Sequence, residues 1–124
     1  MRNISFSLTT EQIKDRSKTV TRRKGGASGW RKLKPGDLLC ACKKCMGLKP
    51  GEKIERLATI RVKKVTFENL SDILPPVRTW EEGVDECYRE GFPKTLPEDF
   101  VKMFVKHMGG NARQEVIRIE FEYT

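Results

Sequence analysis

The fold is decided by residues 56–67, which read RLATIRVKKVTF. Apolar side chains alternate along this stretch as they do on a strand with one buried face; they are Ala58, Ile60 and Val62, then Val65 and Phe67. The alternation slips by one residue at Lys63–Lys64, which is typical of a β-bulge. Because bulges let strongly curved sheets turn their corners, this strand favours a barrel over a flat sheet.

Other strands and helices are predicted on both sides of this strand. Apolar residues alternate again from Ile4 to Leu8 and from Ile117 to Tyr123. The expected elements are, in order, strand 4–8, a short helix to about residue 16, a short strand near 18–23, strands 38–43 and 56–67, helices 80–89 and 96–108, and the closing strand 117–123. This order predicts an α+β domain, a small and mainly antiparallel β-barrel with flanking helices.

Local signals indicate where the helices begin and end and which side chains are buried. Capping-box spacing occurs twice, in the pairs Thr9 with Gln12 and Thr95 with Glu98. Gly109 suits a helix stop. The buried stripe of the second long helix is predicted to comprise Phe100, Met103, Phe104 and Met108. On the closing strand, the inward residues are predicted to be Ile117, Ile119, Phe121 and Tyr123, and the solvent-facing ones Arg118, Glu120 and Glu122.

Positive charge is concentrated in the first half of the chain. The length of 124 residues fits about one domain, so residues 1–124 are taken as a single domain. Residues 1–66 hold 18 Lys and Arg against 5 Asp and Glu, whereas residues 67–124 hold 7 against 12, for a net charge of +8. This distribution indicates one electropositive face and a polyanionic partner. A merely solubilising excess of charge is the alternative.

Neither a membrane span nor a signal peptide is indicated by the sequence, so we expect a cytoplasmic protein that binds no membrane. The cysteines would then be reduced. Cys40, Cys42 and Cys45 lack the twice-repeated pair spacing of structural zinc sites, and only Cys87 or His107 could complete a set. We therefore expect buried thiols, no metal and no cofactor. A zinc-stabilised interaction module is the third-ranked alternative for the whole chain.

Three short motifs follow one another along the chain: Lys18-Thr19-Val20-Thr21-Arg22, Leu33-Lys34-Pro35-Gly36-Asp37 and Glu90-Gly91-Phe92. With the helix and strand that follow them, they resemble the ASCH domain family over nearly the whole chain. That family is similar in fold to PUA domains, compact β-barrels with flanking helices that bind RNA. The amino-acid sequence at 42–49 and 106–109 most resembles that of family members encoded in bacteria and bacteriophages. This chain differs from the family by insertions at 25–31 and 40–53 and by an additional helix before Glu90.

The resemblance implies a cleft between the first and third motifs. One enzymatic branch of the family hydrolyses the acetyl amide of N4-acetylcytidine, and its Lys, Thr and Glu correspond by motif to Lys18, Thr21 and Glu90. In that role a neutral Lys18 would activate the Thr21 hydroxyl, and Glu90 would carry a proton or order water. Partial burial and the neighbouring cations Arg22 and Arg23 are expected to lower the pKa of Lys18.

Two functions therefore stay open at the level of sequence, and so does the oligomeric state. The first is a binding module for RNA or a modified nucleoside, with contacts expected at Lys14, Arg22, Arg23, Lys24, Trp30, Arg31, Lys32 and Lys34. Trp30 would stack on a base or simply anchor its loop. The second is an amidohydrolase that releases acetate from N4-acetylcytidine through Lys18, Thr21 and Glu90. The alternative to a catalytic role is a phosphate contact for Lys18 and an ion pair for Glu90.

Overall fold

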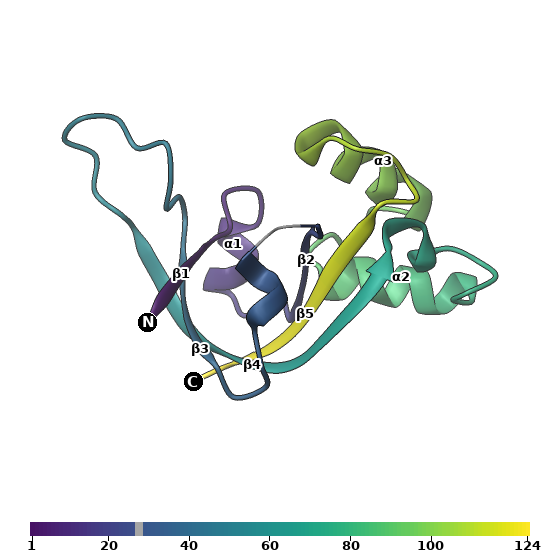
Figure 1. The fold of residues 1–124 in the computed structure, drawn as a ribbon, viewed down its shortest axis with the longest axis horizontal. Coiled ribbons are helices and arrows are strands. Elements are labelled where there is room, and N and C mark those ends of the chain that lie inside the picture. The colour runs from purple at the N-terminus through teal and green to yellow at the C-terminus, as the bar shows by residue number, and fades with distance from the viewer. Residues whose placement is uncertain (27–28) are drawn as a thin grey trace.

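A curled sheet of five strands forms the centre of the computed structural model, which describes residues 1–26 and 29–124 (Figure 1). The strands are β1 (Arg2–Ser5), β2 (Val20–Lys24), β3 (Leu38–Cys42), β4 (Arg56–Asn69) and β5 (Glu115–Tyr123). They lie in the order β1-β3-β4-β5-β2. β1 pairs with β3 in parallel, and the other three pairs are antiparallel.

The longest strand, β4, carries the irregularity that the sequence predicts. Val62 lies opposite Phe121 on β5, whereas Lys64 already lies opposite Glu120, so Lys63 is the additional residue. The bulge expected at Lys63–Lys64 is thereby confirmed. A bulge increases the local twist of its strand, and β4 and β5 bend together across the molecule (Figure 1).

The α+β class and the mainly antiparallel pairing are confirmed, but the sheet contains one parallel pair and forms a half-barrel rather than a closed barrel. Its edges are β1 and β2, and no strand pairing joins them among the described residues. β1 ends at Ser5, and Leu8, which was expected on this strand, is exposed in the following bend. The chain then crosses over through α1 and β2 before β3 returns beside β1, as a parallel pair requires. Too little of the first strand remains to close the sheet.

The sheet is accompanied by three α-helices and two short 3-10 helices in the described part of the chain. They are α1 (Thr10–Lys14), η1 (Gly29–Lys32), η2 (Leu70–Ile73), α2 (Trp80–Arg89) and α3 (Pro97–Met108). Both predicted capping boxes were wrong. Thr9 lacks the extended backbone of a capping residue and makes no capping bond. Leu96 is the residue that precedes α3, because Pro97 sets the first helical position.

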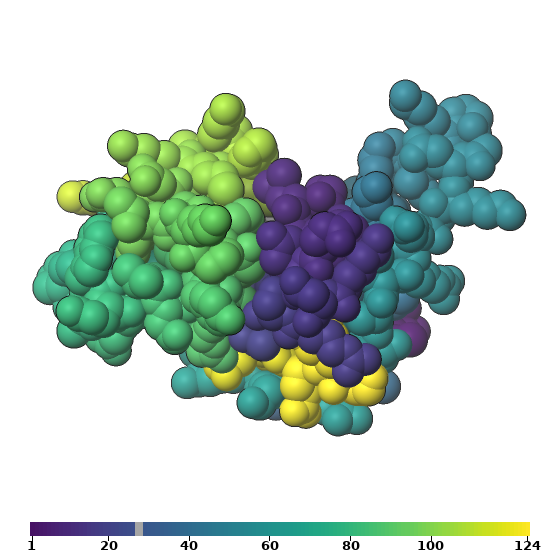
Figure 2. Space-filling model, turned by 180° about the vertical axis from the view of Figure 1, so that it is seen from behind, coloured from purple at the N-terminus to yellow at the C-terminus, as the bar shows by residue number. Residues whose placement is uncertain are grey.

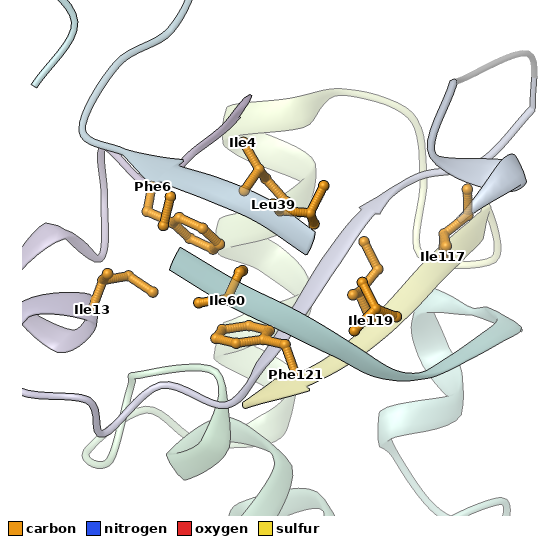
Figure 3. Close-up of a cluster of buried hydrophobic side chains, with 10 residues drawn as sticks. Ile4, Phe6, Ile13, Leu39, Ile60, Ile117, Ile119 and Phe121 are labelled. Carbon is orange, nitrogen blue, oxygen red and sulfur yellow. The ribbon is translucent and has the colours of Figure 1, made fainter. Parts of the chain in front are cut away.

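Two hydrophobic clusters lie on opposite faces of the sheet, since consecutive residues of β5 belong to different ones. The first fills the inside of the curl, where Figure 3 shows its side chains pointing toward one another between the strands. It comprises Ile4, Phe6, Ile13, Leu39, Ala41, Ile60, Val62, Ile117, Ile119 and Phe121. The second packs α2 and α3 against the other face and comprises Leu70, Ile73, Cys87, Phe100, Val101, Phe104 and Val116.

The second cluster corrects two burial expectations. Arg118 was expected to face solvent, but it is only 7% exposed because α2 covers its face of β5. Met108 was expected in the buried stripe of α3, but it is 43% exposed because it is the last residue of that helix. Phe100 and Phe104 are buried as predicted, and Met103 is half-buried.

The segment 43–55, between β3 and β4, projects away from the body of the molecule (Figures 1 and 2). It overlaps the insertion at 40–53, and Met46 on it is 82% exposed. Part of the other insertion, at 25–31, lies outside the described residues. In the described ranges, every helix is too short or too polar to traverse a lipid bilayer.

Replacing Gly83 of α2 by alanine should destabilise the fold, although Gly→Ala inside a helix normally stabilises it by about 1 kcal/mol. A Cβ at Gly83 would lie 2.5 Å from the carbonyl oxygen of Ile73 and 2.9 Å from Cγ of Pro97. Since that oxygen is part of the backbone, the helix must move, and we expect a loss of about 1–3 kcal/mol. Urea unfolding measures it. Val84→Ala, at an exposed position of the same helix, is the control, and a more stable Gly83→Ala protein would contradict the packing described.

Candidate functional site

A pocket of about 170 Å³ lies between the segment that follows β1, strand β2, the end of α2 and helix α3. In Figure 2 the N-terminal segment (purple) lies directly against the helical segments (green). Four aromatic rings line the pocket, those of Phe6, Phe92, Phe100 and Phe104. The ionisable and hydroxyl side chains of its lining include Lys18, Thr21, Arg22, Arg23, Glu90 and His107. The three residues predicted to be catalytic thus share one pocket with two of the predicted binding residues.

Glu90 is held in the wall of the pocket by the way in which α2 ends. It is the residue that follows the helix, and Gly91 adopts a φ of 95°. The amide of Gly91 donates to the carbonyl of Tyr88 and that of Phe92 to the carbonyl of Cys87, which together form a Schellman motif. A Cβ on Gly91 would also lie 3.1 Å from the side chain of Gln12. Glycine is therefore required here for the turn that presents Glu90.

Lys18 lies just before β2 and binds the end of α2. Its Nζ donates to the Glu90 carbonyl at 2.5 Å and to Oε1 of the same residue at 3.0 Å. The carbonyl oxygen of Lys18 accepts a bond from the hydroxyl of Tyr123 at 2.6 Å. A cation at the carbonyl end of a helix is favourable for the helix dipole. Burial lowers the pKa of Lys18 below its usual range, while the Glu90 carboxylate opposes that shift.

Arg22 forms ion pairs both in the pocket and beneath α2. It donates to Oε2 of Glu90 at 2.9 Å and to Oε1 of Glu86. Arg118 holds both oxygens of Glu86, at 2.7 and 2.9 Å. Burial by itself would raise the pKa of Glu86, but the bonds from Arg118 and Arg22 outweigh it and lower the pKa to about 2. Burial likewise opposes the charge on Arg22, yet the carboxylates of Glu90, Glu86 and Glu68 raise its pKa.

Two further ion pairs extend this network toward solvent. Arg78 binds both oxygens of Glu68, at 2.9 and 3.1 Å. Arg89 donates to Glu120 at 2.7 Å. The sequence reasoning missed Glu86 and Glu68, because an acidic residue on an amphipathic helix or strand is usually solvent-facing. A usable signal was Glu86 itself, which lies one helical turn before Glu90 and so shares its helix face.

Thr21 lies at the pocket but is not joined to the ion pairs. Within the described residues, its hydroxyl forms no hydrogen bond with Lys18 or Glu90. Lys18 precedes β2 and Thr21 is its second residue, so the irregular backbone at 18–19 lets both line the same space. The structure therefore brings all three predicted catalytic residues together and connects two of them directly.

Most of the remaining predicted nucleic-acid contacts lie on the surface outside the pocket. Lys24, Lys32 and Lys34 are exposed and form no ion pair within the described part of the chain. Lys14 pairs with Glu11 at 3.7 Å, and Arg31 pairs with Glu115. Among the described residues, the first three lysines are therefore without a carboxylate partner and accessible to a phosphate.

Trp30 occupies a position between its two predicted roles. Its ring is half-buried and packs against the core inside the curl. The guanidinium of Arg2 lies 3.7 Å from the ring centre and donates to the carbonyl of Gly29 at 2.9 Å. The packing of the indole against the core anchors its loop. Because Arg2 covers one face of the ring, that face is not accessible to a base.

The cysteines are free thiols. The sulfur atoms of Cys40 and Cys42 lie 3.8 Å apart on β3, as expected for side chains on one face of a strand. Burial raises the pKa of Cys42 to about 12, and that of Cys87 also to about 12. Across residues 1–26 and 29–124, no three His, Cys, Asp or Glu side chains gather in the way a metal ion needs.

Comparison with known proteins supports the fold and leaves the function open. No family model and no curated protein matches the chain. Among solved structures, it is similar to the crystal structure of protein EF3133 from Enterococcus faecalis V583, of the family DUF984. The TM-score is 0.63 at 14% identity, over 99% of this chain and 79% of the other. A likeness at this identity shows a shared fold.

The stability of the protein should depend on acid through Glu86. Its pKa in the folded state, about 2, lies below the ordinary value of 4.5, so its stabilising contribution is complete above pH 4.5 and is lost as pH falls toward 2. We expect a loss of about 3 kcal/mol over that interval, measured by denaturant unfolding at successive pH values. Glu86→Gln should flatten this dependence. Glu122→Gln, at a half-exposed carboxylate, should keep it, and equal slopes in the two variants would contradict the assignment.

Proposed function

We propose that this chain is an ASCH-type domain whose pocket binds a modified nucleoside, free or within RNA. The observation that supports this function is the composition of the pocket, in which aromatic rings face cationic and hydroxyl side chains. Phe92 and Phe100 lie with ring centres 6.0 Å apart at one side of it. Aromatic rings accept the flat face of a base, and Thr21 and Lys18 offer hydrogen bonds to its edge.

RNA binding would extend from the pocket over the neighbouring surface. Lys24 directly follows Arg23 on β2, and Lys32 and Lys34 lie in and after η1. These side chains are exposed and unpaired within the described residues. Phosphates on either side of a bound nucleoside would find their counter-charges there, since clustered lysines gain free energy from counterion release.

A modified nucleoside should bind the pocket through its aromatic wall. N4-acetylcytidine, titrated into the full chain and followed by isothermal calorimetry, should bind, and Phe92→Ala should weaken binding about 5- to 150-fold. That range corresponds to ~1–3 kcal/mol for stacking on one aromatic side chain. Phe67→Ala, at a half-exposed phenylalanine on β4 outside the pocket lining, should leave the affinity unchanged. If both variants lose affinity equally, the ligand does not occupy this pocket.

Hydrolysis of that ligand is the second candidate function, and the shared location of Lys18, Thr21 and Glu90 favours it. In this reaction the Thr21 hydroxyl attacks the acetyl carbon and cytidine leaves with its amine, after which water releases acetate and restores Thr21. The same titration distinguishes the two functions. With turnover, cytidine and acetate accumulate and Thr21→Val abolishes both products. With binding alone, no product forms and Thr21→Val weakens binding by about 2- to 13-fold, because a neutral hydrogen bond contributes ~0.5–1.5 kcal/mol.

Binding of single-stranded RNA should be largely electrostatic. With about five phosphate contacts, the log–log dependence of affinity on salt should have a slope of about −3 to −4. Replacing Lys24, Lys32 and Lys34 together by Gln should reduce the magnitude of this slope by about 2, which is three contacts at ~0.7 each. Replacing the exposed Lys63, Lys64 and Lys94 is the matched control. A flat salt dependence, or equal losses in both variants, would refute RNA binding by this face.

A further inference from the structure

The pocket holds more positive than negative charge. Its lining has three Lys and Arg side chains, those of Lys18, Arg22 and Arg23, besides His107, and among the described residues a single carboxylate, that of Glu90. Both oxygens of this carboxylate are already engaged, Oε1 by Lys18 and Oε2 by Arg22. Arg22 has Glu86 as a further partner. The excess positive charge of the pocket therefore belongs to Arg23.

Arg23 is held in place without a carboxylate partner. In the described part of the chain, its one side-chain hydrogen bond runs from Nη2 to the carbonyl oxygen of Ser5, at 2.7 Å. Its Nε is buried and has no acceptor among those residues. The guanidinium carbon lies 5.0 Å from the centre of the Phe6 ring. Burial lowers the pKa of Arg23 to about 10, so the side chain is still charged at neutral pH.

The position of Arg23 on β2 separates it from the ion-pair network. Arg22 lies opposite Arg118 on β5, and Arg23 lies opposite Ile117. Since consecutive residues of a strand point to opposite faces, Arg22 is directed to the acidic side chains beneath α2. Arg23 is directed to the inside of the curl, where Phe6 lies. Within the described residues the network therefore forms no hydrogen bond with Arg23, and the Glu90 carboxylate acts on it only through space, by opposing the fall in its pKa that burial causes.

Arg23 is half-buried, and a cation partly removed from water without a counter-charge is destabilising. An anion that enters the pocket would offset that cost. The planar fork of a guanidinium matches the oxygens of a phosphate better than an ammonium does. On the basis of the nucleoside-binding function above, we propose that Arg23 is the anion-binding group of the pocket and that the natural ligand carries a phosphate. The preferred ligand class is thus a nucleoside monophosphate, or a phosphorylated nucleotide of RNA, rather than a free nucleoside.

The test compares cytidine with cytidine 5′-monophosphate by isothermal calorimetry on the full chain. The monophosphate should bind at least tenfold more tightly. Arg23→Gln should reduce its affinity at least tenfold, to near that of cytidine, and should leave the affinity for cytidine within twofold. Arg23→Lys, which keeps the charge and loses the fork, should give an intermediate loss. It also keeps the proposal testable should Arg23→Gln fail to fold, because only a phosphate contact makes its loss specific to the monophosphate.

Lys64→Gln is the matched control, since it removes an exposed positive charge on β4 that lies outside the pocket lining. It should change both affinities by less than twofold. Equal binding of cytidine and its monophosphate by the native protein would overturn the proposal. So would an Arg23 variant that weakens both ligands by the same factor, because that pattern indicates a structural role for the bond to Ser5.

Inorganic phosphate separates this proposal from the proposed function. Its binding is followed by the NMR signal of the Arg23 Nε–H group, identified by its absence in Arg23→Lys. If neither cytidine nor its monophosphate binds but phosphate shifts that signal, the nucleoside function fails and the anion site stands. If cytidine binds and neither phosphate nor the monophosphate affects the signal, the nucleoside function stands and the anion site fails.

Discussion

The carboxylate of Glu90 holds the two parts of the pocket together. It binds Lys18 and Arg22, which lie 72 and 68 residues earlier in the chain, and it is almost completely buried. Lys18 also binds the carbonyl oxygen of Glu90, so the end of α2 is attached to the start of β2 through both main chain and side chain. The left-handed turn at Gly91 makes this geometry accessible. Together with the hydrophobic packing of α2 and α3 against the sheet, these bonds position the aromatic wall opposite the basic strand.

The network around Glu90 has more influence on geometry than on net stability. Removing a charged group from water costs several kcal/mol. Most of the attraction between the buried charges only offsets this cost. What the network supplies is orientation, because Glu86 receives two bonds from Arg118 and one from Arg22. These hydrogen bonds fix the position of α2 over β5. The two arginines of β2 point to opposite faces of the strand. Arg22 forms ion pairs in this network, and Arg23 lines the pocket without joining the network.

Most of the fold was accessible from local sequence patterns. The additional residue of β4 at Lys63 produced a visible slip in the alternation, and the helices 80–89 and 96–108 were placed within one residue. The errors about burial on β5 and about closure of the sheet have one origin. Alternation on β5 correctly indicates that Ile117 and Arg118 point to opposite faces, but it does not reveal that a helix covers the second face. Similarly, it does not reveal that the first strand stops at Ser5 and leaves the barrel half open.

The candidate site shows the same division between local and distant information. The sequence by itself determined that Lys18, Thr21 and Glu90 are present in motifs that resemble one family, and that the first half of the chain is basic. Only the tertiary structure decided which charges are neutralised. The partners of Arg22 lie between 46 and 68 residues away, and Arg23, its immediate neighbour, has none of them. The residue types determine which side chains are charged. Whether a positive charge is neutralised depends on which distant carboxylates the packing of α2 brings within hydrogen-bonding distance.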